Sequence, residues 1–133
     1  MLDEDLRAVR AGAGSTLEAI ERMTHLLPVL FLEQRAQMPI LFEFWTQARR
    51  EPVVWQAAIE PYRRYQAFFA GMIRDGIAEG AFKPADAEVA AQALVSLVIG
   101  LLLQSMVEPA DVEWGNRAQA SVGLFLKGLA AGA

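Results

Sequence analysis

The strongest constraint on this chain is a stretch of 19 residues without a charged side chain, between Glu88 and Glu108. Such a stretch is nearly long enough to cross a bilayer as a helix. It lacks flanking Lys or Arg, no second such stretch occurs, and it contains four polar residues, Gln92, Ser96, Gln104 and Ser105. We therefore expect no membrane span, but a helix of a soluble protein that is buried on nearly every side.

The chain has the length of one domain, but its hydrophobic content is high for a soluble domain. The chain has 133 residues, which is the size of a single domain, and 54% of them are hydrophobic. That excess predicts an internal cavity or a subunit interface. The net charge is −4 and the basic residues do not cluster, so the chain itself is not expected to bind nucleic acid. An acidic N-terminus and the absence of cysteine predict a cytoplasmic protein without a secretory signal, disulfides or thiolate sites.

Apolar residues recur at helical spacing along the chain, and no segment alternates with period two. We expect residues 1–14 to be the end of a helix that runs into an Ala/Gly linker. A capping box at Ser15 and Glu18 starts the first full helix, which continues to about residue 31. Further helices are expected at 38–50, 52–79, 85–107 and 112–129, with bends at Pro28 and Pro61. The predicted fold is an all-α, antiparallel bundle of about five helices.

Two segments carry a resemblance to a known family. One comprises residues 44–52 (FWTQARREP), and the other comprises residues 62–65 (YRRY) followed by residues 73–82 (IRDGIAEGAF). The second ends in an Ile-x-x-Gly-Ile-x-x-Gly-x-Phe pattern and precedes an acidic, Ala-containing segment and an apolar helix. These segments are similar to the C-terminal half of TetR-family transcriptional regulators, and the resemblance extends over about residues 15–130.

The resemblance implies a function that the composition does not. In this family the C-terminal half binds a small effector and dimerises through its last two helices, whereas an N-terminal helix-turn-helix domain reads DNA. Nothing before Ser15 has the pattern of a helix-turn-helix. We therefore interpret residues 1–14 as the end of the linking helix and residues 15–133 as the ligand-binding and dimerisation domain of a repressor. DNA contact is expected only through an N-terminal domain that this chain lacks.

Aromatic side chains concentrate on the predicted inner faces of the helices at 38–50 and 52–79. Tyr and Trp carry polar tips that a dry core would have to satisfy, and flexible methionines suit an adaptable pocket. With the resemblance, this pattern favours a small-molecule cavity, while an ordinary aromatic core remains the alternative. The candidate ligand-contacting residues are Phe42, Trp45, Trp55, Tyr62, Tyr65, Phe69, Met72 and Gln104. The lack of an obvious buried Lys or Arg predicts an apolar or aromatic ligand, oriented by Tyr62, Tyr65 and Gln104.

Polar and small residues recur every fourth position along the charge-free helix, from Glu88 to Glu108. Such a row packs well at a helix crossing, and small side chains allow close approach. We expect a homodimer interface there, with a tight contact inside the monomer or a ligand contact as alternatives. The candidate interface residues are Gln92, Ser96, Gly100, Trp114, Val122 and Phe125.

Residues that support catalysis are scarce. The one histidine, His25, follows Glu21 by four positions, but no second His or Cys could complete a metal site. No glycine-rich loop follows a strand, and no serine has a recognisable base. We expect no enzyme, no metal and no cofactor. The alternative to a repressor domain is a stand-alone helical protein that binds a small molecule or acts as a scaffold, without DNA binding.

Overall fold

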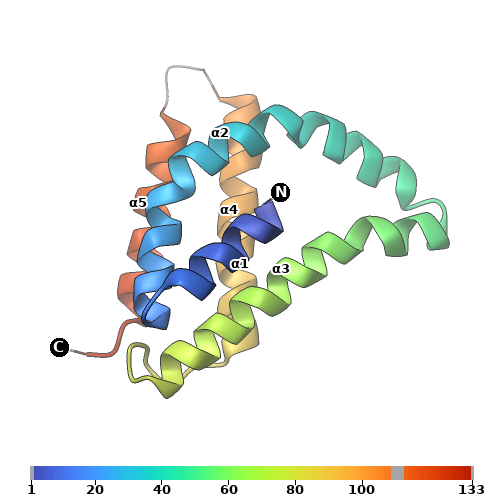
Figure 1. Cartoon of the computed structure of the whole chain (residues 1–133). Helices are drawn as coiled ribbons and strands as arrows, with labels where there is room; N and C mark the ends of the chain where they lie inside the picture. Colours follow the sequence, from blue (N-terminus) through green and yellow to red (C-terminus); the bar gives the residue numbers. More distant parts are fainter. Residues whose placement is uncertain (1, 109–112, 133) are drawn as a thin grey trace.

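The computed structural model describes residues 2–108 and 113–132, with side chains from residue 4 onward. Within these ranges the chain forms only α-helices and no β-strand. The helices are α1 (Leu2–Gly12), α2 (Thr16–Ala48), α3 (Pro52–Ala78), α4 (Ala87–Val107) and α5 (Trp114–Leu129) (Figure 1). The all-α prediction is confirmed. The expected start of the last helix, at residue 112, lies outside the described residues.

The prediction of two separate helices before Pro52 is wrong. Residues 16–48 form a single helix, α2, which contains both Pro28 and Pro39 and follows a long arc (Figure 1). Each internal proline costs roughly 3 kcal/mol, because it removes one backbone hydrogen bond and crowds the preceding turn. Burial of one face along the whole length, from Met23 through Phe31 to Met38, offsets this cost. The described residues form five helices, as expected, but one of the five is α1, and residues 16–48 form one helix in place of two.

The start of α2 differs in one detail from the expected capping box. The Ser15 hydroxyl accepts a hydrogen bond from the backbone N–H of Glu18 at 3.1 Å, as predicted. The Glu18 carboxylate, however, accepts from the N–H of Gly14 at 2.8 Å. The cap therefore also holds the preceding linker, so that α1 is turned back sharply onto α2.

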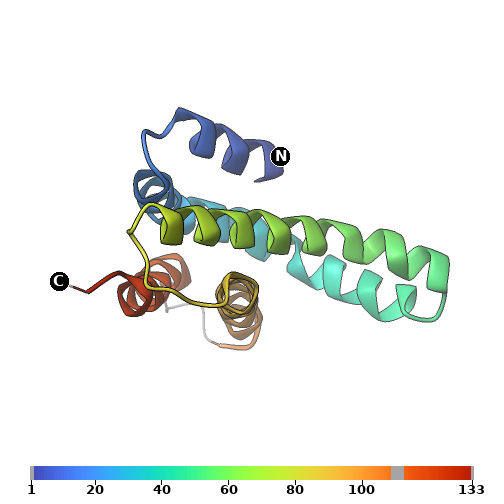
Figure 2. The ribbon, with the colours of Figure 1, turned by 90° about the horizontal axis from the view of Figure 1, so that it is seen from below.

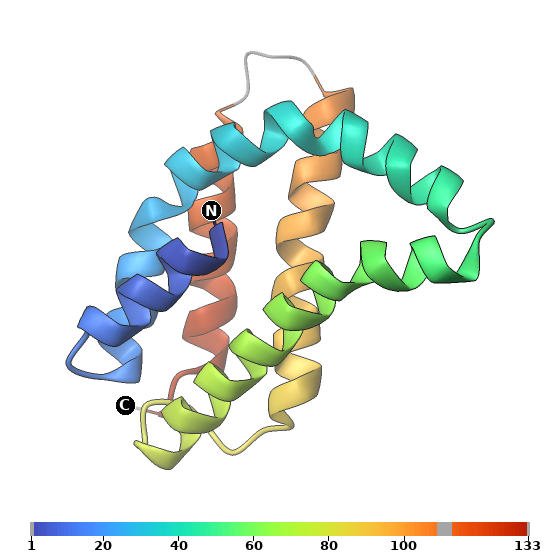
Figure 3. The same ribbon diagram turned by 45° about the vertical axis from the view of Figure 1, so that its right-hand side comes forward.

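The helices pack in three layers. Figure 2 shows α1 on one side, α2 and α3 in the middle, and α4 and α5 side by side on the other. The contacts agree, because α2 packs against all four other helices and α4 packs against both α3 and α5. Figure 3 shows that α2 and α3 project beyond α4 as a helical hairpin. It also shows the bright-green part of α3, which contains Pro61, turned relative to the yellow-green part, as expected for an internal proline.

The Gly-x-Phe motif at the end of α3 has a packing role. Gly80 follows α3 with a φ of 81°, a left-handed conformation that glycine adopts without strain. This reverses the chain, so that the N–H groups of Ala81 and Phe82 both donate to the carbonyl of Gly76, at 2.9 and 3.2 Å. The Phe82 ring, which is 3% exposed, then lies directly on Gly76. The motif thereby closes the lower end of the bundle.

We predict that Gly76→Ala destabilises the protein. A Cβ at this position would lie 2.4 Å from Cδ2 of Phe82 and would force the buried ring to move. The free energy of unfolding should fall by about 1–3 kcal/mol, as in other overpacked cores. Urea denaturation measures this change. Gly71→Ala, also within α3, is the matched control, because its Cβ would meet no atom within 4 Å and should be neutral or stabilising. Equal effects of the two substitutions would contradict the packing role.

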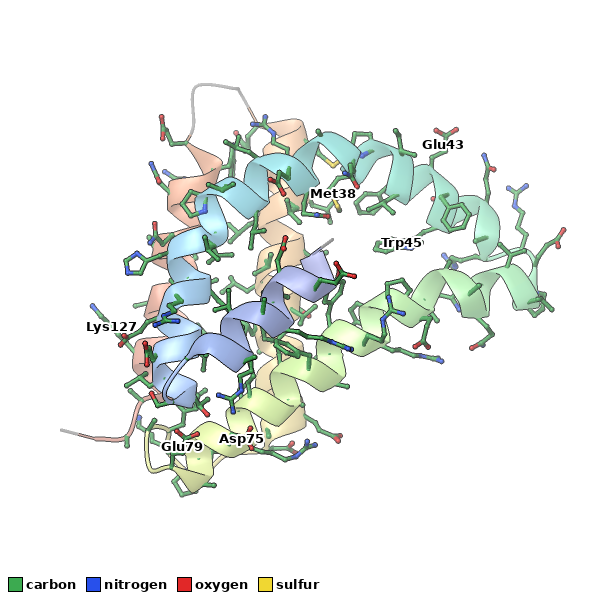
Figure 4. The ribbon with its side chains drawn as sticks, in the orientation of Figure 1. Met38, Glu43, Trp45, Asp75, Glu79 and Lys127 are labelled. Carbon is green, nitrogen blue, oxygen red and sulfur yellow. The ribbon has the colours of Figure 1, made fainter. Side chains whose placement is uncertain are left out.

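A polar junction joins α1, the start of α2 and the end of α3. The Glu79 carboxylate accepts from the backbone N–H of Thr16 at 3.1 Å and also from the Thr16 hydroxyl, while Thr16 itself is fully buried. Beside it, the Arg10 guanidinium pairs with Asp75 at 2.8 Å. Figure 4 shows Asp75 and Glu79 at the same end of α3. The hydrogen bonds from Thr16, with the positive charge of Arg10, hold the pKa of Glu79 below its ordinary value of 4.5, although desolvation opposes them.

We predict that this junction makes the fold acid-sensitive. The pKa of Glu79 is lower in the folded than in the unfolded state, so the ionised carboxylate stabilises the fold at pH values above its unfolded-state pKa. This stabilisation is lost as the pH falls through the folded-state pKa. Glu79→Gln should lower the free energy of unfolding near neutral pH and flatten its decline from about pH 6 to about pH 3. Urea denaturation at each pH measures both effects. The exposed Glu21→Gln is the control, and an unchanged pH profile in Glu79→Gln would refute the prediction.

Candidate functional site

A cavity of about 400 Å³ lies among the five helices. One face of α2 supplies the longest wall, from Ile20 to Trp45, and α3 supplies the facing wall, from Ala58 to Ile73. The segment of α4 from Leu94 to Leu102 forms the floor, and α5 adds Val122 and Leu126. One residue of α1, Leu6, completes the enclosure. The volume suits a small organic molecule.

The cavity exists because the hydrophobic core is divided. Three separate buried clusters occur: one joins α2, α4 and α5, a second joins α3 and α4 with Phe82, and a third joins α1, α2 and α3. Residues of all three clusters border the void, such as Phe31 of the first, Ile73 of the second and Met72 of the third. The curved α2 and bent α3 meet the straight α4 without filling the space between the clusters.

The cavity walls are apolar and carry no charged side chain among the described lining residues. The polar residues of the lining are Thr24, Gln34, Tyr62 and Tyr65. The Thr24 hydroxyl donates to the carbonyl of Ile20 at 2.8 Å, within its own helix. A charged ligand would therefore meet no side chain of opposite charge among these lining residues.

Five of the predicted ligand-contacting residues line this cavity: Trp45, Tyr62, Tyr65, Phe69 and Met72. Figure 4 shows Trp45 directed from α2 into the space facing α3. Four of the six predicted aromatic residues therefore belong to the cavity wall.

The other three predicted contacts lie elsewhere. Phe42 packs against the cluster of α2, α4 and α5, with its ring edge-to-face on Trp45 at 5.9 Å and 71°. Trp55 is half-buried near the start of α3, in the projecting hairpin and outside the lining. Gln104 is exposed on α4 and turned away from the cavity. Helical spacing placed all three on plausible faces, but it could not show how far the void extends along each helix.

Several lining residues are absent from the predicted set, for different reasons. Gln34 lies in the part of α2 for which the sequence predicts a connection between two helices. The α4 wall was missed because that helix is apolar on nearly all sides, so its sequence does not indicate which side faces inward. Leu6 was assigned to a frayed linking helix. A continuous reading of the apolar stripe in α2 would have included Gln34.

The predicted interface residues separate into two groups. On α4, Gln92 and Ser96 are exposed, and an added Cβ at the half-buried Gly100 would meet no atom within 4 Å. The polar row of α4 therefore does not form a tight contact inside the monomer. Its outer face includes exposed Val89 and Val107, which are 62% and 82% accessible.

On α5 the predicted interface residues are on the wrong face. Trp114 is buried against Phe31, Met38 and Leu102, and Val122 forms part of the cavity wall. Phe125 is half-buried. Residues 114, 118 and 122 are spaced by four and therefore share the inward face of the helix. The outward face instead carries Arg117, Ala120 and Leu124.

α4 also has the length and composition of a membrane span, although only 33% of its most apolar stretch is buried. Core helices of soluble proteins have the same length and composition. In this structure one side of α4 packs on α2, α3 and α5, which accounts for that part of its apolar surface. The opposite side requires a different explanation.

Comparison with known proteins agrees with this geometry. Residues 16–131 match the family described as "BetI-type transcriptional repressor, C-terminal". Comparisons with curated proteins and with solved structures gave no match. The family match begins where α2 begins, extends beyond the end of α5 and includes the cavity walls on α2 to α5. Regulatory domains of this family are generally not enzymes. The chain belongs to the BetI-type branch of the TetR-family C-terminal domains and is the effector-binding domain of a transcriptional regulator.

Proposed function

We propose that the domain senses an uncharged, mostly apolar small molecule, with room for an aromatic ring, in the cavity between α2 and α3. The single observation that carries this proposal is a void of about 400 Å³ with apolar walls and no charged side chain among its described lining residues. An apolar ligand that fills such a cavity gains contacts with its walls. We infer that Tyr62 and Tyr65, which line the cavity, orient such a ligand through their hydroxyl groups.

The proposed readout passes through α1. Leu6 belongs both to the cavity lining and to the cluster that fixes α1 on α2 and α3. A ligand that displaces Leu6 would therefore change how α1 is seated. In the intact repressor, a DNA-reading domain attached before α1 would be moved by that change, and DNA affinity would fall. The effect is limited by the difference between the ligand's affinities for the two positions of α1.

We also propose a homodimer that forms through the outer faces of α4 and α5 and acts in the cytoplasm. On α4, residues 89, 93, 96, 100, 103 and 107 make one continuous outward stripe. Leu124, which is 74% exposed, lies on the outward face of α5. These two helices form one outer layer (Figure 2), so a second copy could cover both at once. Such a partner would remove from water the apolar side of α4 that the monomer leaves uncovered.

The cavity proposal predicts binding of the uncharged fluorescent probe N-phenylnaphthylamine. Ala58→Phe should weaken binding by about tenfold or more, because Ala58 lines the cavity and a phenyl ring would occupy part of the void. Trp55→Phe, outside the lining, is the matched control and should bind the probe as the unmodified protein does. Fluorescence titration measures the affinities, and thermal unfolding checks that each variant folds. Failure of the unmodified protein to bind the probe would overturn the proposal, as would unchanged affinity in folded Ala58→Phe.

The dimer proposal predicts that Gly100→Arg or Ser96→Arg dissociates the protein. Either change would force a charge into a close-packed contact between copies, so the dissociation constant should rise by about a hundredfold or more. Sedimentation at tens of micromolar distinguishes the two states. Gln37→Arg, on the exposed side of α2, adds the same charge elsewhere and should remain dimeric. A monomeric unmodified protein would refute the proposal.

A further inference from the structure

Gln34 stands in the middle of the apolar wall that α2 presents to the cavity. It lies between Phe31 and Met38, which are 2% and 4% exposed, on the face that continues to Trp45. Figure 4 shows Met38 and Trp45 on the side of α2 that faces α3, and helical spacing places Gln34 on that same side. An amide therefore stands between the apolar residues Phe31 and Met38 of the cavity wall.

The side-chain amide of Gln34 is available for hydrogen bonding. Among the residues that the structure describes, neither its oxygen nor its nitrogen has a hydrogen-bond partner. The neighbouring polar groups are occupied, since Arg35 donates to the carbonyl of Ser105 at 3.0 Å and Thr24 donates to Ile20. Gln34 is half-buried, and its amide atoms are not among the fully buried side-chain atoms without a partner, so solvent reaches them. The amide is therefore available to a group that enters the cavity.

We propose that Gln34 is the specificity-determining residue of the effector site, and that the effector carries an uncharged carbonyl or hydroxyl group on an otherwise apolar body. This inference rests on the proposed small-molecule function of the cavity. A primary amide both donates and accepts hydrogen bonds without bearing charge, so it satisfies either group. A carboxylate or an ammonium group would lack a counter-charge in this wall. The ligand's oxygen and the Gln34 amide satisfy each other, while the remaining surface of the ligand fills the void.

The test compares probes that differ by one polar atom. Acetonaphthone carries a carbonyl and ethylnaphthalene is its near-isosteric hydrocarbon; naphthol and naphthalene form the corresponding hydroxyl pair. Competition against N-phenylnaphthylamine gives the affinity of each. In Gln34→Leu the affinity for at least one oxygen-bearing probe should fall about tenfold, while its hydrocarbon counterpart binds equally or more tightly. Gln34→Leu should therefore lose the preference for the oxygen-bearing probe over its hydrocarbon counterpart. Thermal unfolding checks that this variant folds.

Two control variants separate Gln34 from the other polar groups. Thr24→Val removes a hydroxyl that is already bonded within α2, so both selectivities should persist. Tyr62→Phe removes a hydroxyl from the facing wall. Unchanged selectivity for both probe pairs in Gln34→Leu would overturn the inference but leave the cavity proposal intact. This holds whether or not Tyr62→Phe loses the selectivity. If none of the probes binds the unmodified protein, both the cavity proposal and this inference fail.

Discussion

The apolar face of α2 contacts every other helix of the domain, and the arrangement of those helices follows from its length and curvature. A helix of 33 residues is about 50 Å long, which exceeds the length of α4 or α5. Its first half packs on α5 and α1. Its second half packs on α4 through Met38 and then projects with α3 as a hairpin (Figure 3). The two internal prolines bend this helix without ending it, since burial of a continuous face outweighs two missing backbone hydrogen bonds.

This geometry explains why the interior contains a void. A curved helix and a bent one cannot both follow a straight third helix over their whole length. The core therefore closes at three places and stays open between them. The side chains at the opening are large, flexible or aromatic, such as Met72, Trp45 and Phe69, and they can adjust to a guest. Because α1 contributes Leu6 to the same void, the effector site and the packing of α1 on α2 and α3 depend on the same side chain.

In the outer layer, which α4 and α5 form, one side of α4 remains uncovered. α4 carries no charge over its whole central part, yet the monomer buries only one side of it. A chain of this size has too few helices to surround α4 completely, since α2, α3 and α5 all pack on the same side of it. The uncovered side includes small and polar residues such as Ser96 and Gly100. These residues make nonspecific association of the monomer less favourable and suit a close contact between helices.

Much of the local structure could be read from the sequence, because it depends on neighbouring residues. Helical spacing predicted the all-α class and the bounds of α3, α4 and α5 within a few residues, and the Ser15 cap predicted the start of α2. Five of the eight predicted ligand-contacting residues line the cavity, and four of the five are aromatic side chains whose helical spacing marks an inner face. Only the tertiary structure decided that α2 continues through Pro28 and Pro39, that Trp114 and Val122 point inward, and that Gln34 meets a void. Periodicity identifies the faces of a helix, but what each face meets depends on packing between residues that are distant in the chain.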